Sequence, residues 1–345
     1  MSVPGCYLVV DAGTSRTRVR LWGHGGVVAE AHAHVGARDV ALAGDPRPIA
    51  EALRDLIATV RERQDDEPQA VVCSGMITSN VGLVEVPHAT APVALVDLAD
   101  RVVRHDVPTV TDLPMYFVPG VKTVAAEVGW DSLSGFDVMR GEEAEVVGLL
   151  AQLELEPPLV VFHCGSHHKL IELAAQDAAS TPGAVDALER TVVARSSTAI
   201  TGELLAALRE STILASSLAD LDGLDLDQAA VAAGVRHARR SGFARAAFLV
   251  RVGETIAGLD RTAVTSFLLG ALACLDLQFI EHATDVGDDI VVYGGGLFPV
   301  IVSDMLNCVR PGRSRIVDRS VSDGASTVGT VRLLELYLSR RERDA

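Results

Sequence analysis

Aromatic residues are scarce in this sequence and make up only 4% of its 345 residues. Hydrophobic residues of all kinds still reach 48%, so the buried cores must be built mainly from Val, Leu, Ala and Ile. A chain of 345 residues is too long for one ordinary hydrophobic core and is typical of two domains. We therefore expect two separately packed cores.

Cysteine is also scarce, with five widely spaced residues and no C-x-x-C pair. An odd number of scattered cysteines is unlike the disulfide framework of a small secreted domain and favours a reduced, cytoplasmic protein. The chain lacks a run of about 18 uninterrupted apolar residues, so we expect no membrane span. The first residues lack the charged segment of a signal peptide, so none is expected.

Positive charge is in deficit, because 30 Lys and Arg residues face 46 Asp and Glu residues and give a net charge of −16. An acidic surface repels a phosphate backbone, which argues against binding to nucleic acid. The net charge does not exclude a small anionic substrate, since a local Arg or Lys pocket can override it.

Short apolar runs that end at glycine or serine alternate with helix-like periods, which predicts an α/β fold. The first three runs predict an antiparallel meander. Pro114 interrupts the stretch 109–118, so an edge strand is the most that it can form. The expected strands are 6–10, 17–22, 27–31, 70–73, 159–162, 289–293 and 315–317, and the expected helices are 49–63, the end of 137–153, 201–209, 224–240, 262–282 and 325–338.

Two α/β halves emerge from this pattern. The stretch Glu154–Pro158, with sequence ELEPP, is the best candidate linker between them. We therefore predict an N-terminal lobe over residues 1–155 and a C-terminal lobe over residues 156–345.

The first stretch that carries chemistry is Asp11-Ala12-Gly13-Thr14-Ser15, between the first two predicted strands. A tight glycine turn lets backbone N–H groups approach phosphate oxygens, and the hydroxyls of Thr14 and Ser15 add donors. Asp11 can hold a hydrated Mg²⁺, which carries the charge of a nucleotide tail. An ordinary β-hairpin turn has the same pattern, so both interpretations stay open.

A second stretch, Val138 to Glu143, places two carboxylates at the predicted start of a helix. Glu142 and Glu143 there can simply complement the helix dipole. Alternatively, one of them is a general base that accepts the proton of a substrate hydroxyl. Arg140 can bind a substrate carboxylate or the transferred phosphoryl group.

A third stretch, His163 to Lys169, invites two interpretations. Its His and Cys residues suggest zinc, but the spacing does not fit the common ligand pairs and no second cluster completes four ligands. The alternative is a second phosphate-binding turn, in which Gly165 and Ser166 follow a buried strand and Lys169 supplies a cation.

The fourth stretch is Gly294-Gly295-Gly296, between a predicted strand and a predicted helix. Pro299 stands where the third glycine of G-x-G-x-x-G would be, so a Rossmann dinucleotide site is disfavoured. Consecutive glycines at a strand–helix junction suit the close approach of an adenosine group. A plain loop is the alternative.

The order of these four stretches resembles that of the actin-like sugar kinases. This resemblance implies two ribonuclease-H-like lobes with an interlobe cleft that close on ATP and substrate. Within that group the sequence resembles the 2-dehydro-3-deoxygalactonokinases, also named 2-keto-3-deoxygalactonate kinases. The resemblance is carried by SGMITSNVGLVEVPHATAP at 74–92, DVMRGEEAEVVG at 137–148, GSHHK at 165–169 and TAITGELL at 198–205.

This family resemblance implies ATP-dependent phosphorylation of the 6-hydroxyl of a 2-keto-3-deoxy sugar acid, with Mg²⁺ as cofactor. It implies Glu142 as the base, with Glu143 in reserve, and Thr201-Gly202-Glu203 as a family signature without an assigned role. The implied phosphate contacts are Asp11, Gly13, Thr14, Ser15, Gly165 and Ser166, the adenosine contacts Gly294, Gly295 and Gly296, and the sugar-acid contacts Met76, Ser79, Asn80, Arg140 and Lys169.

The sequence also departs from the family pattern. Ala12 and Leu170 stand where the family usually has Trp, which predicts a reshaped pocket if those rings line one. Thr78 replaces a small, glycine-like position. Three alternative functions stay open: a kinase for another sugar acid or a polyol, an actin-like ATPase, and a regulatory sugar-acid binder without transfer activity. The expected partner is a small sugar acid, and a homodimer stays open.

Overall fold

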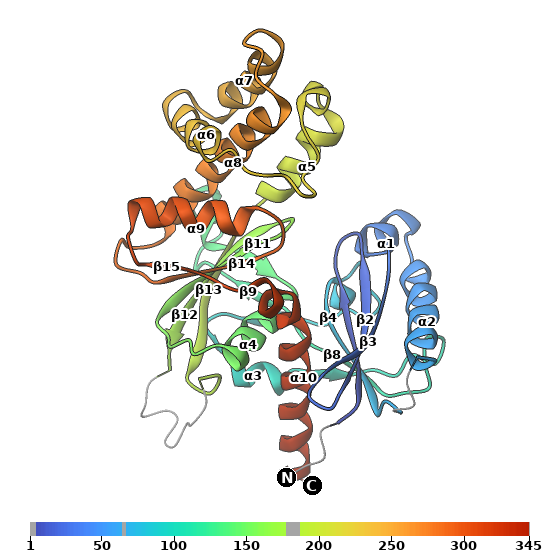
Figure 1. Cartoon of the computed structure of the whole chain (residues 1–345). Coiled ribbons are helices and arrows are strands. Elements are labelled where there is room, and N and C mark those ends of the chain that lie inside the picture. Colours follow the sequence, from blue (N-terminus) through green and yellow to red (C-terminus); the bar gives the residue numbers. More distant parts are fainter. Residues whose placement is uncertain (1–4, 64–66, 177–186, 345) are drawn as a thin grey trace. The chain divides into compact units, whose positions relative to one another are not determined.

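A computed structural model of the chain describes residues 5–63, 67–176 and 187–344 (Figure 1). The chain forms two compact units. Unit 1 comprises residues 1–157, 173–196 and 320–345, and unit 2 comprises residues 158–172 and 197–319. The chain first passes from unit 1 to unit 2 at Pro157–Pro158, inside the predicted linker. The division into lobes at residue 155 stays a proposal.

Unit 1 is built on a six-stranded sheet with the order β3-β2-β1-β4-β8-β7. The first three strands form the predicted antiparallel meander, and β4 pairs in parallel with β1. This parallel pairing sets the ends of β1 and β4 side by side at one edge of the sheet. The strands are β1 (Tyr7–Ala12), β2 (Thr17–Gly23), β3 (Gly26–Ala33), β4 (Ala70–Gly75), β7 (Val103–Arg104) and β8 (Met115–Phe117).

The expectation of an edge strand within residues 109–118 is wrong. The strand β8 lies between β4 and β7. It is only three residues long and begins directly after Pro114, whose carbonyl accepts a hydrogen bond from Val71 N–H at 2.9 Å. The proline therefore precedes the strand and does not interrupt its ladder.

Helix α2 (Arg47–Arg61) covers one face of the unit 1 sheet (Figure 1). Its buried side chains recur with the spacing of one helical face, which places them against the core beneath β1, β2 and β4. The buried side chains are Ile49, Leu53, Leu56, Ile57 and Val60. A short helix, α1 (Ala37–Ala43), precedes it.

A second, three-stranded sheet of unit 1 leads into the helix that carries the predicted acids. Its order is β10-β9-β5, and β10 ends directly before Arg140. Helix α4 (Glu142–Gln152) follows. The remaining elements are β5 (Ala89–Thr90), β6 (Val93–Ala94), α3 (Leu95–Ala99), β9 (Val121–Thr123), β10 (Asp137–Met139) and α10 (Arg319–Asp344).

Unit 2 contains a sheet in which β15, β14, β11 and β12 are successive neighbours. Its hydrophobic core also includes side chains from the helices of this unit. The part formed by α5, α6, α7 and α8, the helical end, is at the top of Figure 1. The strands β12 and β13 each contain residues of both units. The elements are β11 (Leu159–Cys164), β12 (His168–Ala175), β13 (Thr191–Ala199), α5 (Thr201–Ser211), α6 (Gln228–Ser241), α7 (Phe243–Thr255), α8 (Arg261–Ala283), β14 (Ile290–Gly294), α9 (Phe298–Val309) and β15 (Ser314–Ile316).

Helix α8 is the central helix of unit 2. Among the described residues it is the one helix long and apolar enough to cross a membrane by length and composition. However, 72% of its most apolar window is buried within the protein, and it packs against α6, α7 and α9. Asp260 caps its start, since its carboxylate accepts a hydrogen bond from Ala263 N–H at 2.9 Å. These contacts are those of a core helix.

Candidate active site

The predicted phosphate turn joins β1 to β2 and is closed by its own backbone. Gly13 N–H donates to Arg16 O at 2.8 Å, and the carbonyls of Gly13 and Thr14 accept hydrogen bonds from the first two N–H groups of α1. The Gly13 N–H, which the sequence prediction assigned to a phosphate, is therefore already engaged. Within the described residues, the hydroxyls of Thr14 and Ser15 make no hydrogen bond and stay candidates for phosphate contacts.

Asp11 lies near the end of β1, directly before this turn. Burial raises the pKa of Asp11 above its usual value, and the Glu142 carboxylate adds to the rise, whereas Arg18 and Arg20 oppose it. Its carboxyl group therefore lies close to a second acid from a distant part of the sequence. This pairing concentrates negative charge at the strand end, which favours a cation there.

The end of β4 lies beside Asp11. In the parallel register, Asp11 is opposite Ser74 and Ala12 is opposite Gly75. Gly75 has φ of +81°, and a Cβ at this position would lie 2.6 Å from Ala12 O. Only glycine allows this close approach with this backbone conformation. The sequence therefore brings the two strand ends into direct backbone contact.

The predicted substrate stretch Met76–Asn80 continues from Gly75 as a short 3₁₀ turn. Ser79 is buried, and its hydroxyl donates to Met76 O at 2.7 Å and accepts from Val81 N–H at 3.3 Å. The Ser79 side chain thus closes the turn. Asn80 is exposed. The roles of Met76, Ser79 and Asn80 in sugar-acid binding stay predictions.

Arg140 is held by three hydrogen bonds within unit 1. Its Nη1 donates to Thr78 Oγ1 at 2.7 Å, and its Nη2 donates to Val86 O at 2.7 Å and to His88 Nδ1 at 3.2 Å. Burial, together with the positive charges of Arg140 and Lys122, lowers the pKa of His88 to about 4, so the ring is neutral and accepts at Nδ1. Within the described part of the chain, the other two of the five guanidinium N–H groups of Arg140 make no hydrogen bond.

Sequence reasoning missed His88 as a partner of Arg140. The two residues are 52 positions apart, so no local periodicity connects them. The available signal was that His88 lies inside residues 74–92, one of the stretches that resemble the sugar-acid kinases. Thr78 was noted only as a departure from the family pattern, and its hydroxyl now has a clear structural partner in Arg140.

The two predicted acids begin α4. Arg140 N–H donates to Glu142 Oε2 at 3.0 Å, and Gly141 N–H lies 2.8 and 2.9 Å from the two carboxylate oxygens of Glu143. Gly141 has φ of +110°, and a Cβ there would lie 3.3 Å from the Cα of Gly75. The start of α4 is therefore packed against the end of β4, which brings its acids near Asp11.

The environments of the two acids differ. Glu143 is fully buried, and burial together with the neighbouring Glu142 raises the pKa of Glu143 to about 8 although the Gly141 N–H opposes the rise. Glu142 is half-buried. A general base must reach the hydroxyl proton of its substrate, so the geometry favours Glu142. Glu143 caps the helix start and stays the reserve candidate.

In unit 2, the structure brings two predicted nucleotide stretches together. The strands β11 and β14 pair in parallel with Cys164 opposite Gly294, and a Cβ on Gly294 would lie 2.2 Å from Cys164 O. The turn Gly165–Ser166 and the junction Gly294–Gly296 therefore leave neighbouring strands at the same edge. Open space surrounds the Cα of Gly295 and Gly296, which suits a flat ligand.

Lys169 follows the second turn and is only 4% exposed. Its position on β12 is beneath the surface of unit 2, so direct contact with the sugar acid is not favoured and stays a prediction. Across the described ranges, no three His, Cys, Asp or Glu side chains cluster as a zinc centre would require. The zinc interpretation of residues 163–169 therefore gains no support.

Two departures from the family pattern fall in hydrophobic cores. Ala12 belongs to the core of unit 1, and Leu170 belongs to the core of unit 2. Both side chains are almost completely buried. The absence of large rings at these positions is therefore a matter of core packing.

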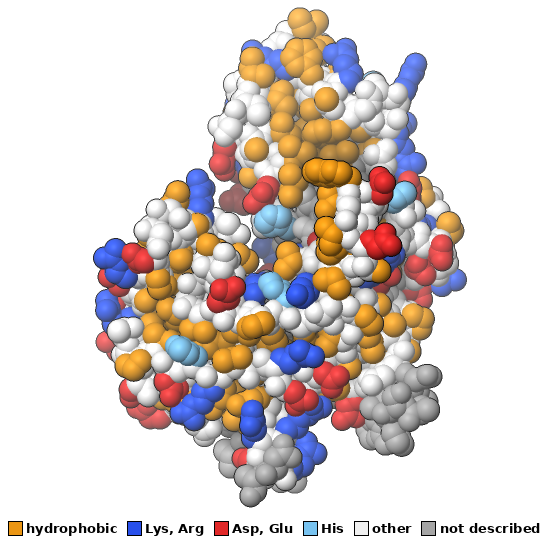
Figure 2. Space-filling view, turned by 180° about the vertical axis from the view of Figure 1, so that it is seen from behind, with side chains coloured by type: hydrophobic (Ala, Val, Ile, Leu, Met, Phe, Trp, Pro, Cys, Tyr) orange, Lys and Arg blue, Asp and Glu red, His pale blue; other side chains and the backbone are white. Residues whose placement is uncertain are grey.

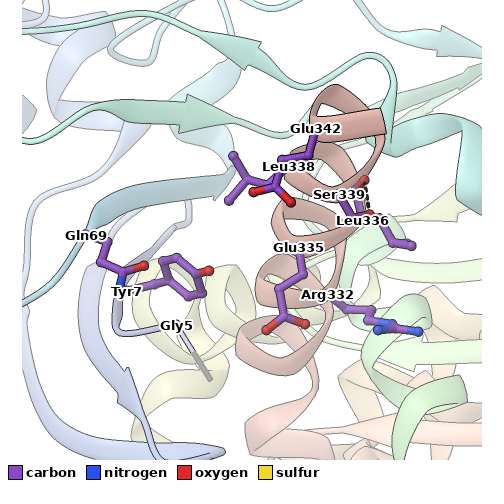
Figure 3. Close-up of a pocket in the computed structure, with 9 residues that line it drawn as sticks. All are labelled: Gly5, Tyr7, Gln69, Arg332, Glu335, Leu336, Leu338, Ser339 and Glu342. Atoms are coloured by element: carbon purple, nitrogen blue, oxygen red, sulfur yellow. Dashed lines mark hydrogen bonds between the residues drawn. The ribbon is translucent and has the colours of Figure 1, made fainter. Parts of the chain in front are cut away.

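A separate cavity of about 410 Å³ lies at the other end of β1 (Figure 3). Tyr7, the first residue of β1, faces Glu335 of α10 across it, whereas Asp11 lies near the last residue of that strand. Burial raises the pKa of Glu335 above its usual value. The length of β1 separates this cavity from the convergence of Asp11 with Glu142.

The helical end of unit 2 also carries an apolar pocket of about 370 Å³, formed by α6, α7 and α8. Hydrophobic side chains are visible on the surface of this helical end at the top of Figure 2. Phe248, Ile256 and Leu259 of this region are exposed. The pocket contains none of the predicted site residues.

Comparison with protein families finds a match to the family described as 2-keto-3-deoxy-galactonokinase, over residues 11–316. Among solved structures, a candidate 2-dehydro-3-deoxygalactonokinase from Sinorhizobium meliloti is similar over 95% of each chain, with 24% identity and a TM-score of 0.71. No protein in a search of curated sequences matches significantly.

A more distant solved structure is the activator of the 2-hydroxyisocaproyl-CoA dehydratase from Clostridium difficile, with bound ADPNP. It is 9% identical, with a TM-score of 0.51 over 98% of this chain and 97% of its own. The predicted fold class is confirmed: the chain has the actin-like ATPase fold.

The buried carboxyl of Glu143 predicts a dependence of stability on pH. The pKa of Glu143 is about 8, above the reference value of 4.5. The protonated carboxyl therefore contributes fully to the free energy of unfolding below about pH 4.5, and this contribution is lost as the pH rises to about 8. The loss proceeds at up to about 1.4 kcal/mol per pH unit. Glu143→Gln cannot ionise, so we expect the variant to gain stability relative to wild type across this range.

Urea unfolding of both proteins at several pH values measures this difference. Glu145→Gln, on the same first turn of α4, is the control for the loss of one carboxylate from this turn. A constant difference between Glu143→Gln and wild type would contradict the assignment of a raised pKa.

Proposed function

Because the chain belongs to the 2-keto-3-deoxy-galactonokinase family, we propose that it transfers the γ-phosphoryl group of ATP to the 6-hydroxyl of 2-dehydro-3-deoxy-D-galactonate. The sugar-acid kinase function itself follows from the family. The observation that carries the finer proposal is the convergence of Asp11, Gly75 and Glu142 at one edge of unit 1. Glu142, which can accept a proton, lies there beside Asp11, which can face a cation bound to phosphate.

Glu142 is proposed as the general base. As the substrate oxygen forms its bond to the γ-phosphorus, the hydroxyl proton moves to the Glu142 carboxylate and the bond from that phosphorus to the leaving oxygen of ADP breaks. The Arg140 N–H holds one carboxylate oxygen of Glu142 at 3.0 Å. This contact orients the carboxylate before the substrate binds, which is the main requirement of phosphoryl transfer.

Asp11 is proposed to face the magnesium ion that accompanies ATP. Magnesium prefers hard oxygen ligands and keeps most of its water, so one or two carboxylates suffice. The environment of Asp11 fits this requirement, because burial and the nearby Glu142 disfavour an uncompensated negative charge. When bound, the ion would neutralise charge on the phosphates. Thr14 and Ser15 supply hydroxyl donors next to Asp11.

Arg140 is proposed to bind the carboxylate of the sugar acid. Its two remaining N–H groups suit a carboxylate, and its three internal bonds fix the plane of the guanidinium. In unit 2, the turn Gly165–Ser166 is proposed to bind phosphate and the junction Gly294–Gly296 to approach adenosine. The open space at Gly295 and Gly296 supports the second assignment.

A coupled ADP-release assay with Mg-ATP tests the proposed reaction. Over a panel of 2-keto-3-deoxy acids, hexonates and polyols, 2-dehydro-3-deoxy-D-galactonate should give the highest kcat/KM. Glu142→Gln should lower kcat about 100-fold or more, the usual scale of general-base loss. Glu145→Gln is the matched control and should keep wild-type turnover. Full activity of Glu142→Gln would exclude Glu142 as the base.

The role of Asp11 predicts a changed response to magnesium. Asp11→Asn keeps the shape of the side chain but removes its charge, so we expect turnover to fall by about 100-fold or more at a fixed magnesium concentration. Initial rates measured against magnesium concentration check this. Asp97→Asn, at an exposed position of α3, is the control. An unchanged magnesium response in Asp11→Asn would remove Asp11 from this role.

The role of Arg140 predicts a loss of selectivity for the acid group. Arg140→Lys keeps the charge but loses the planar fork, so the KM for the sugar acid should rise by about tenfold or more while the KM for ATP changes less. The comparison substrate is the carboxamide of the same sugar acid. Wild type should prefer the acid strongly, and Arg140→Lys should reduce that preference. An equal loss on both substrates would mean that Arg140 acts on structure alone.

A further inference from the structure

The two predicted phosphate turns are supported in the same way inside their own units. In unit 1, a Cβ on Gly36 would lie 2.6 Å from the carbonyl oxygens of Gly13 and Thr14, and the following N–H groups of α1 donate to them. Helix α1 therefore starts directly against the turn. The contact depends on glycine at the residue before the helix, because any side chain would separate the two backbones.

In unit 2, the start of α5 makes the equivalent contact. A Cβ on Gly202 would lie 2.1 Å from Gly165 O and 2.7 Å from Ser166 O, and Glu203 N–H donates to Ser166 O at 2.9 Å. Gly202 and Glu203 belong to the Thr-Gly-Glu signature, which has no role assigned from its side-chain chemistry. The signature therefore supports the Gly165–Ser166 turn from behind through its backbone.

In each unit, a side chain at the start of the strand after the turn (β2 or β12) is linked to the residue before the supporting glycine (Gly36 or Gly202). The two units differ in how this link is made. In unit 1 the link is direct: Thr17, the first residue of β2, donates from its hydroxyl to Val35 O at 2.7 Å, one residue before Gly36. In unit 2 the first residue of β12 is His168, and the residue before the glycine is Thr201. No direct bond joins these two, and a third side chain connects them.

That third side chain is Asp276 of α8. Thr201 Oγ1 donates to Asp276 Oδ1 at 2.6 Å, and His168 Nδ1 lies 2.9 Å from Asp276 Oδ2, so the imidazole donates to the carboxylate. All three residues are buried, with exposed fractions of 4% or less. Phe162 and Phe298 place their rings edge-on to His168. A buried carboxylate is retained only where both oxygens have partners, as they have here.

We propose that Asp276 is a positioning residue for nucleotide binding: it ties His168 to Thr201 and so fixes the Gly165–Ser166 turn between β12 and α5. The inference rests on the proposed function, since it assigns that turn to a phosphate of ATP. Asp276 does not touch the nucleotide. It acts through His168, which follows the turn at the start of β12, and through Thr201, which precedes the supporting Gly202.

The test is Thr201→Val, which keeps the shape of the side chain and removes the hydroxyl that donates to Asp276. We expect the Kd and the KM for ATP to rise about ten- to hundredfold, because small displacements of a binding group have effects of this size. The KM for the sugar acid should change less than twofold. Thr201→Ser retains the hydroxyl and should restore most of the ATP affinity. In Asp276→Asn, the amide NH₂ group faces one of the two donors, His168 or Thr201, and cannot accept its hydrogen bond. This variant should therefore lose ATP affinity as Thr201→Val does.

Thr265→Val is the matched control. Thr265 is an equally buried threonine of unit 2, and its hydroxyl accepts from Ala219 N–H at 2.9 Å, away from the turn. It should lower the unfolding temperature about as much as Thr201→Val and leave the ATP constants unchanged. Direct titration with ATP, without the sugar acid, is run beside the turnover assay.

The two measurements distinguish the outcomes. If wild type binds ATP but phosphorylates none of the acids, the proposed function fails, and weaker ATP binding by Thr201→Val still supports the role of Asp276. If wild type is active and Thr201→Val has unchanged ATP constants, the positioning role is overturned and the function stands. Equal loss of ATP affinity in Thr201→Val and Thr265→Val, or no ATP binding by wild type, also overturns it.

Discussion

The absence of a Cβ where the ends of β1 and β4 meet is the constraint on which the candidate site of unit 1 depends. Gly75 brings the end of β4 within contact of Ala12, and Gly141 brings the start of α4 against Gly75. A Cβ on Gly75 would lie 2.6 Å from Ala12 O, and Gly141 has a φ of +110° that favours glycine. These two glycines therefore allow the start of α4 to bring Glu142 beside Asp11. Any larger residue at Gly75 would move Glu142, the proposed base, away from the proposed phosphate turn without changing a chemical group of either.

This packing concentrates charge in a small volume. Glu142 interacts with both Asp11 and Glu143, and the pKa of each of these two is raised, with burial as the main cause. Unpaired buried carboxylates are costly, so a site of this kind is stabilised by proton uptake or by a cation. Glu143 is stabilised by proton uptake, as its raised pKa indicates, and the Gly141 N–H is its hydrogen-bond partner. The proposed magnesium ion at Asp11 would be the cation.

Much of this could be predicted from the sequence, because it depends on local patterns. The meander, β4, α2 and α8 follow from periodicity, and their positions agree with the predictions to within a few residues. Periodicity failed for β12, β13 and α7, which were not predicted. The alternation in β12 is broken, since His168 to Ile171 are all buried. A strand buried on both faces lacks the period-two signal.

The polar contacts that hold the site could not be predicted, because they join distant residues. Arg140 and His88 are 52 residues apart, and Thr201 and Asp276 are 75 residues apart. Asp276 lies in a largely apolar stretch of α8, and the sequence offers no reason to pair it with a turn more than 100 residues earlier. The Thr-Gly-Glu stretch contacts the Gly165–Ser166 turn through its backbone, and side-chain chemistry does not reveal such a contact.

The residues proposed to act on the sugar acid and those that support the Gly165–Ser166 turn belong to different units. Changes in them should therefore affect different kinetic constants. Arg140 and Glu142, the proposed contacts of the sugar acid, belong to unit 1. Thr201 and Asp276, which support the Gly165–Ser166 turn, belong to unit 2. Under the proposed function, a change in unit 2 that displaces only this turn would affect the sugar acid only through the bound nucleotide. The constants for ATP and for the sugar acid should therefore respond to different sets of residues, and a variant that altered both equally would point to a general loss of packing.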